Sequence, residues 1–186
     1  MLTHRFDDAL RYASALHRTQ FRKVSNIPYI AHLMSVSALV LEYGGDEDQA
    51  IAGLLHDAVE DQGGLNTLDH IRQTYGPRVA GIVMECSDND GEDKLPWQDR
   101  KDAYIASIAS KSDDAILVTG CDKLHNATTI LTDLQVLGPQ VFDRFTAKRD
   151  GTLWYYRTLS DALTPRAPAP LSTRLAETVT AIEAIA

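Results

Sequence analysis

The sequence is poor in the features that mark secreted, membrane-bound and disulfide-stabilised proteins. It has only two cysteines, Cys86 and Cys121, and their positions match no metal-binding motif, so we expect reduced thiols. No apolar run approaches the ~20 residues that cross a bilayer, and the first residues include acids and lack the apolar stretch of a signal peptide. We therefore expect a cytoplasmic protein that does not associate with membranes.

Positive charge is also scarce in this chain. The 18 lysines and arginines are outnumbered by 26 aspartates and glutamates, which gives a formal net charge of −8. This balance argues against a surface that coats nucleic acid, and we expect no nucleic-acid partner. A polyanionic small molecule would need a local cation at its binding site, either a metal ion or a basic cluster.

The chain does contain enough apolar residues for one domain with a sizeable core. Of its 186 residues 44% are hydrophobic, and apolar positions recur at helical spacing along most of the sequence. We predict an all-α, single-domain helical bundle over residues 1–186. The expected helices cover residues 4–20, 28–43, 47–61, 66–75, a segment from Pro96, 113–137 and 140–163, and a last helix after the proline-rich connector 164–170.

Side chains and glycines at the ends of these segments support the assignment. Thr3, Asp46 and Ser112 are suitable N-cap residues, and glycines end several of the apolar patterns. Residues 78–86 read either as a helix or as a buried strand. The polar, aperiodic segment 87–95 is the best candidate for a mobile loop.

Ionisable residues interrupt the apolar pattern at one place in particular. The segment AGLLHDAVED, residues 52–61, contains His56, Asp57, Glu60 and Asp61 within six positions. Burying these groups without partners would be costly, and a divalent metal would remove that cost for His56 and Asp57. The alternative is the solvated acidic end of an amphipathic helix, because short motifs often occur by chance.

Two other helices carry polar residues that change this balance. Asp122, Asn126 and Thr129 fall on one face of the helix predicted over 113–137, which suggests a lined cavity rather than an ordinary wet face. His32 interrupts the apolar helix 28–43, where a lone histidine is usually a satisfied core residue. In combination with the others it becomes a candidate metal ligand.

His32, His56, Asp57 and Asp122 together form a set of nitrogen and oxygen ligands. Without thiolates, such a set suits Mn²⁺ or Fe²⁺ better than a structural zinc ion. Four protein ligands in an octahedral shell leave room for water, which a metal makes more acidic and able to attack phosphorus near neutral pH. The sequence therefore indicates a divalent metal site with room for a bound water.

Three segments, FRKVSNIPYIAHL, AGLLHDAVED and CDKLHN, resemble in order and spacing the motifs of the RelA/SpoT-type hydrolase domain, a branch of the HD-domain phosphohydrolases. The resemblance spans about residues 5–160. It implies an all-helical fold and one Mn²⁺ per chain, held by His32, His56, Asp57 and Asp122, with other divalent metals possible. It also implies removal of the 3′-pyrophosphate from (p)ppGpp or (p)ppApp, which leaves GDP or GTP, or ADP or ATP, plus pyrophosphate.

The resemblance also implies roles for six other residues. Glu60 and Asp61 would orient or deprotonate the attacking water and manage the proton of the leaving group. The substrate-binding residues would be Arg22 on the nucleobase, Lys23 on phosphate, and Asn126 and Thr129 on the ribose or phosphate side. Further candidates for a local positive cluster are Lys94, Arg100, Lys101 and Lys123, although each of them reads more readily as a solvated surface residue.

The sequence departs from the family pattern at three positions, and this leaves the substrate open. Leu33 follows His32 in place of proline, no basic residue precedes Asp122, and Thr128 stands where an arginine is common. None of these removes a metal ligand. Alternatives to a guanosine alarmone hydrolase are an adenosine alarmone hydrolase, an HD-type nucleotide phosphomonoesterase, including an NADPH 2′-phosphatase, and a non-catalytic alarmone-binding module. The sequence leaves the oligomeric state undetermined.

Overall fold

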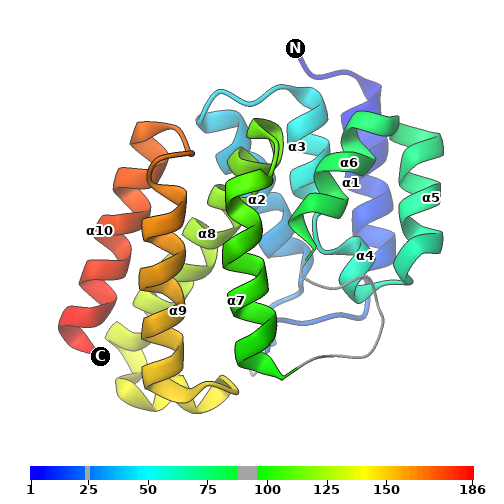
Figure 1. Cartoon of the computed structure of the whole chain (residues 1–186). Helices are drawn as coiled ribbons and strands as arrows, with labels where there is room; N and C mark the ends of the chain where they lie inside the picture. The colour runs from blue at the N-terminus through cyan, green and yellow to red at the C-terminus, as the bar shows by residue number, and fades with distance from the viewer. Residues whose placement is uncertain (24–25, 88–95) are drawn as a thin grey trace.

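The computed structural model describes residues 1–23, 26–87 and 96–186. Within these ranges the chain is helical and contains no strand, apart from an isolated antiparallel bridge between Phe21 and Pro28. The all-α prediction is confirmed (Figure 1). The helices are α1 (His4–Leu16), α2 (Ile30–Glu42), α3 (Glu47–Leu55), α4 (Ala58–Asp61), α5 (Gly64–Tyr75), α6 (Pro77–Cys86), α7 (Trp97–Ser107), α8 (Asp113–Leu137), α9 (Lys148–Leu163) and α10 (Ala169–Ile185), with short 3-10 turns at Ile108–Ser110 and Pro139–Arg144.

The long helix α8 joins the two sides of the bundle. It packs against α2, α3 and α6 on one side and against α9 and α10 on the other. In Figure 1, α1, α5 and α6 lie on the right of the view, and α9 and α10 lie on the left. Because α2, α3 and α8 contact one another in the middle, side chains from these three helices can meet in the interior.

Local sequence signals account for several helix ends. Thr3, Asp46 and Ser112 each cap a helix as predicted, and Asp46 forms a full capping box with Gln49. Helix α8 has the predicted bounds. The segment that read as helix or strand is helical, as α6. The predicted mobile loop 87–95 lies outside the described residues except for Ser87.

The predicted continuous helix over residues 47–61 is wrong at one place. Helix α3 ends at Leu55, His56 and Asp57 form a turn, and α4 begins at Ala58. A continuing helix would bond the Gly53 carbonyl to the backbone amide four residues later. Instead, this carbonyl accepts a hydrogen bond of 2.9 Å from His56 Nδ1. The histidine therefore caps the end of α3 with its own side chain.

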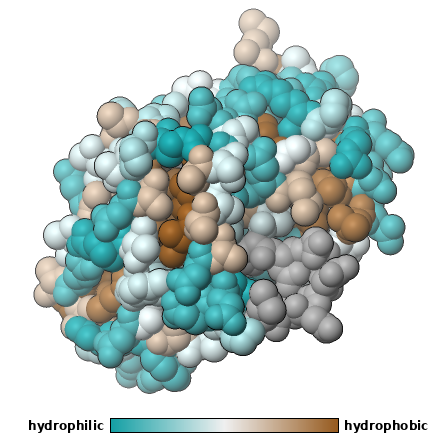
Figure 2. All heavy atoms as spheres, in the orientation of Figure 1, coloured by the Kyte–Doolittle hydropathy of each residue, from teal (hydrophilic) through white to brown (hydrophobic). Residues whose placement is uncertain are grey.

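The C-terminal helix belongs to the same packed core as the rest of the bundle. Leu171, Leu175, Val179 and Ile182, the apolar stripe of α10, are all buried, and α10 packs on α8 and α9. Both cysteines are free thiols, as expected. Among the described helices none has the length and apolar character that a bilayer crossing requires. The face seen in Figure 2 is largely hydrophilic, with separate hydrophobic areas.

A close approach of α2 and α3 depends on Gly53. A Cβ atom at this position would lie 3.0 Å from Ser37 Cα and 3.3 Å from Ser37 N, so the two helix backbones would have to separate. We expect Gly53→Ala to lower the free energy of unfolding by about 1–3 kcal/mol, the usual cost of overpacking. Chemical denaturation would measure this change.

Gly81 in α6 provides the matched control. It is exposed, and a Cβ atom there would meet nothing within 4 Å. Gly81→Ala should stabilise the protein by roughly 0.5–1 kcal/mol, because alanine favours a helix interior. Equal effects of the two substitutions would contradict the proposed backbone contact.

Candidate metal centre and substrate cavity

Two buried histidines from neighbouring helices point toward the same place. His32 on α2 and His56 at the end of α3 are 1% and 2% exposed. Each ring uses Nδ1 for a hydrogen bond, His56 with the Gly53 carbonyl and His32 with His125 Nδ1 at 2.8 Å. Neither Nε2 has a hydrogen-bond partner among the described residues. Buried polar atoms rarely remain unsatisfied, so these two nitrogens call for a ligand.

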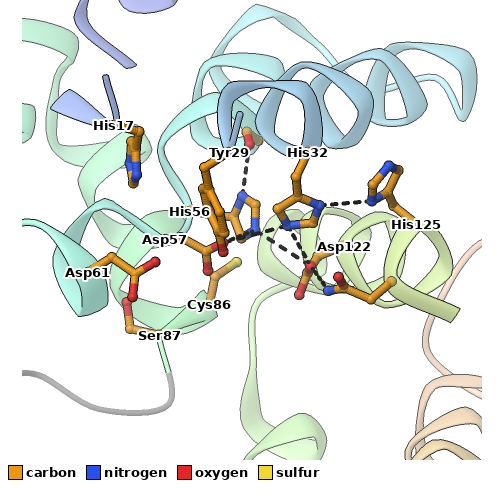
Figure 3. A network of polar contacts seen from close by, with 12 residues as sticks. His17, Tyr29, His32, His56, Asp57, Asp61, Cys86, Ser87, Asp122 and His125 are labelled. Carbon is orange, nitrogen blue, oxygen red and sulfur yellow. Dashed lines mark hydrogen bonds and ion pairs between the residues drawn. The ribbon is translucent and has the colours of Figure 1, made fainter. Parts of the chain in front are cut away.

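Two aspartates lie opposite these nitrogens (Figure 3). Asp57 Oδ2 is 3.1 Å from His56 Nε2 and 3.6 Å from His32 Nε2. Asp122 Oδ1, which comes from α8, is 3.3 Å from His32 Nε2 and 3.6 Å from His56 Nε2. The four residues that sequence reasoning chose as metal ligands are therefore brought together from three parts of the chain.

The donor atoms of this cluster fit a divalent cation. Ligand atoms of His32, His56 and Asp57 all lie within 4.8 Å of one another, and Asp122 Oδ1 adjoins both imidazoles. Two nitrogens and two carboxylate oxygens suit ions of intermediate hardness.

The charges of the cluster shift the pKa values of its members. Burial disfavours the charged form of His56, but Asp57 and Asp122 outweigh this effect and raise the pKa of His56 well above its ordinary value. Burial likewise acts to raise the pKa values of both aspartates. The charge of His56 and the nearby His32 ring hold the pKa of Asp57 well below its ordinary value. Lys123 and the two histidines do the same for the pKa of Asp122.

Further side chains hold the two carboxylates in place. The Tyr29 hydroxyl donates to Asp57 Oδ2 at 2.6 Å, and Asn126 Nδ2 donates to Asp122 Oδ1 at 2.6 Å. Lys123 Nζ lies 2.7 Å from Asp122 Oδ2. Each carboxylate is thus oriented by a donor outside the cluster, as is usual around metal ligands.

Asp61 has a different environment from that of the four clustered residues. Its Oδ2 accepts a hydrogen bond of 2.7 Å from Gln20 Nε2. The amide oxygen of Gln20 accepts from His17 Nδ1 at 2.7 Å and from Gln62 Nε2 at 2.6 Å, so the amide cannot turn over without losing bonds. Desolvation raises the pKa of Asp61, and the bond from Gln20 opposes that change only in part.

A cavity of about 390 Å³ opens beside the cluster. Of the residues singled out in the sequence, it is lined by Asp57 and Asp122 and by Arg22, Lys23, Glu60, Asn126 and Thr129. His32, His56 and Asp61 are not among its lining residues. The predicted acid and base residues therefore separate, because Glu60 faces the cavity while Asp61 turns toward Gln20.

The cavity collects positive charge in an acidic protein. Its described lining has five cationic and four acidic side chains, although the whole chain has a net charge of −8. The cationic ones are Arg22, Lys23, Lys101, Lys123 and Arg144. Lys101 and Lys123 are confirmed as neighbours of the site, Arg100 is not among the lining residues, and Lys94 lies outside the described residues.

Sequence reasoning missed several residues that take part in this site. Tyr29 and His125 lie inside the recognised segments FRKVSNIPYIAHL and CDKLHN, and their position there was the available signal. Gln20 and Arg144 carried no comparable signal. Arg22, which the sequence predicts to stack on the nucleobase, already has partners within the protein. Its Nη2 donates to Asn126 Oδ1 at 2.7 Å, and its Cζ lies 5.8 Å from the Tyr29 ring centroid.

A helical bundle with a His-Asp pair at a helix end, and a further histidine and aspartate on two neighbouring helices, defines the HD-domain class. The family described as "HD domain" matches residues 9–153, and the chain belongs to this family.

Two known relatives of this chain carry the same protein name. The chain is 36% identical over 138 residues to guanosine-3′,5′-bis(diphosphate) 3′-pyrophosphohydrolase MESH1 of Drosophila melanogaster. The aligned region covers 73% of this chain and 72% of that protein. The chain is 34% identical over 136 residues to the Homo sapiens protein of the same name, with 72% and 71% covered.

Solved structures agree with these relatives. One is titled "A metazoan ortholog of SpoT hydrolyzes ppGpp and plays a role in starvation responses"; it superposes with a TM-score of 0.78 at 32% identity, over 97% of this chain and 96% of that one. A Listeria monocytogenes protein matches with a TM-score of 0.70 at 27% identity, over 80% of this chain and 96% of that one.

The raised pKa of His56 predicts how metal binding depends on pH. In the metal-free protein this residue keeps its proton above ~6.5, the ordinary value for histidine, and a cation must displace that proton. The affinity for a divalent ion should therefore still rise with pH above ~6.5, where an ordinary histidine has already lost its proton, and binding should release protons. Calorimetry of Mn²⁺ binding in two buffers with different heats of ionisation would measure the release, and identical heats would contradict it.

Proposed function

We propose that this protein hydrolyses guanosine 3′,5′-bis(diphosphate) at its 3′ position and releases pyrophosphate. The observation that carries the proposal is the cavity, where the His/Asp cluster, Glu60 and five cationic side chains meet. A metal-binding cluster beside a cationic wall suits a substrate with two diphosphate groups. The printed names of the MESH1 relatives support this substrate.

We further propose that His32, His56, Asp57 and Asp122 hold one divalent ion, with Mn²⁺ as the preferred metal. The two unsatisfied buried nitrogens and the adjoining carboxylates support this assignment. When bound, the ion would supply positive charge for the phosphoryl oxygens and make water more acidic.

We propose separate roles for Glu60 and Asp61, which have different surroundings. In the proposed reaction, a water oxygen attacks the phosphorus next to the ribose 3′-oxygen, and the bond between that phosphorus and the 3′-oxygen breaks. Glu60, which lines the cavity beside Asp57, would take the proton of the attacking water. Asp61, the next residue in the chain, accepts a hydrogen bond from Gln20. It would supply the proton that the departing 3′-oxygen takes up.

The remaining cavity residues would bind the substrate. Lys23, Lys101, Lys123 and Arg144 are suited to its phosphates, and Asn126 and Thr129 to its ribose or phosphate side. Arg22 would turn from Asn126 toward the nucleobase. We propose that residues 1–186 act as one domain, since α10 packs on α8 and α9.

Purified protein loaded with Mn²⁺ should release pyrophosphate from ppGpp, which a coupled pyrophosphate assay would detect. Running ppApp in parallel tests the base preference that the sequence leaves open. Release of orthophosphate would instead favour a phosphomonoesterase. Tight ppGpp binding without turnover, measured by calorimetry, would favour a binding module.

Two variants separate metal binding from the proton transfer. His56→Ala should lose the ion and the activity together. Glu60→Gln should keep the ion but lower turnover by roughly 10²–10⁴-fold, the usual contribution of a general base. Metal content and rate measured on the same samples distinguish the two, and an unimpaired Glu60→Gln rate would refute its assigned role.

A further inference from the structure

The histidine ligand on α2 has a partner that the proposed function does not use. His32 Nδ1 lies 2.8 Å from His125 Nδ1, and the ring centroids are 4.8 Å apart (Figure 3). His125 follows Asp122 by three residues on α8. Helix α8 therefore supplies both the candidate metal ligand Asp122 and the hydrogen-bond partner of the candidate ligand His32.

The contact joins two ring nitrogens, so one must donate and the other must accept. To bind a metal, His32 Nε2 must offer its lone pair, and a neutral imidazole then carries its hydrogen on Nδ1. His125 Nδ1 must therefore be the acceptor. The reverse arrangement would place the hydrogen of His32 on Nε2, where it would face Asp57 and Asp122 and block a cation.

The second histidine ligand needs no such help. His56 Nδ1 donates to the Gly53 carbonyl at 2.9 Å, and a carbonyl oxygen can only accept. The backbone thus fixes the tautomer of His56, whereas the tautomer of His32 depends on the side chain at position 125.

We propose that His125 is a positioning residue that accepts a hydrogen bond from His32 Nδ1 and thereby fixes His32 as an Nε2 metal ligand. The proposal rests on the metal site of the proposed function. It assigns to His125 an effect on metal affinity that does not require contact with the ion or the substrate. Partners of this kind commonly change metal affinity by ~10–100-fold when they are replaced.

Three variants test this role by Mn²⁺ affinity, measured in competition with a chelating dye. His125→Phe keeps a ring but offers no acceptor, and it should bind Mn²⁺ about 10–100-fold more weakly than the wild type. His125→Asn restores an acceptor oxygen and should bind nearly as tightly as the wild type. His70→Phe is the matched control, because His70 is an exposed residue of α5 whose ring lies 4.8 Å from that of Tyr12, and it should change nothing.

Nitrogen NMR of the Zn²⁺-loaded wild-type protein gives an independent result even where a variant folds poorly. We expect the hydrogen of both His32 and His56 on Nδ1. A hydrogen on His32 Nε2, or a His125→Phe affinity equal to that of the wild type, would overturn the role of His125 and leave the metal site intact. A wild-type protein that binds neither Mn²⁺ nor Zn²⁺ would overturn both.

Discussion

The site depends on one electrostatic constraint, the close approach of two carboxylates and two imidazole nitrogens inside an apolar bundle. Asp57 and Asp122 lie within 3.1–3.6 Å of nitrogens that have no hydrogen-bond partner among the described residues. Collecting such groups away from water is expensive unless something compensates their charge. The packing of α2, α3 and α8 holds them together, and a cation is the compensation that their donor atoms suit.

Side chains that line the cavity also contact the two clustered carboxylates. Asp122 accepts from Asn126 on one oxygen and pairs with Lys123 on the other, and both of these neighbours line the cavity. Tyr29 connects Asp57 to the cavity in the same way. A substrate that rearranges the cavity wall would therefore act directly on the proposed metal ligands Asp57 and Asp122. Metal affinity and substrate affinity are expected to be coupled for this reason.

Much of this arrangement was accessible from the sequence, and the remainder has an identifiable physical cause. Periodicity and capping residues predicted the bounds of α8, because they act within one helix. The break after α3 was missed because the bond from His56 Nδ1 to the Gly53 carbonyl competes with the helix ladder and leaves no mark in the apolar pattern. Gln20 and Arg144 were missed because their roles arise only from contacts between distant segments.

The distribution of charge reconciles an acidic protein with a polyanionic substrate. With a net charge of −8 the chain repels such a molecule at long range. At physiological salt, however, this repulsion is largely screened at distances beyond about 8 Å. Lys123 and the other four cationic lining residues act at shorter range, inside the cavity. The desolvation that burial would impose on Lys123 is outweighed by Asp122, which raises the pKa of this lysine well above its ordinary value and keeps it charged. The same carboxylate thus helps to prepare both the metal site and the cationic wall, so that the net charge of the chain says little about what its cavity attracts.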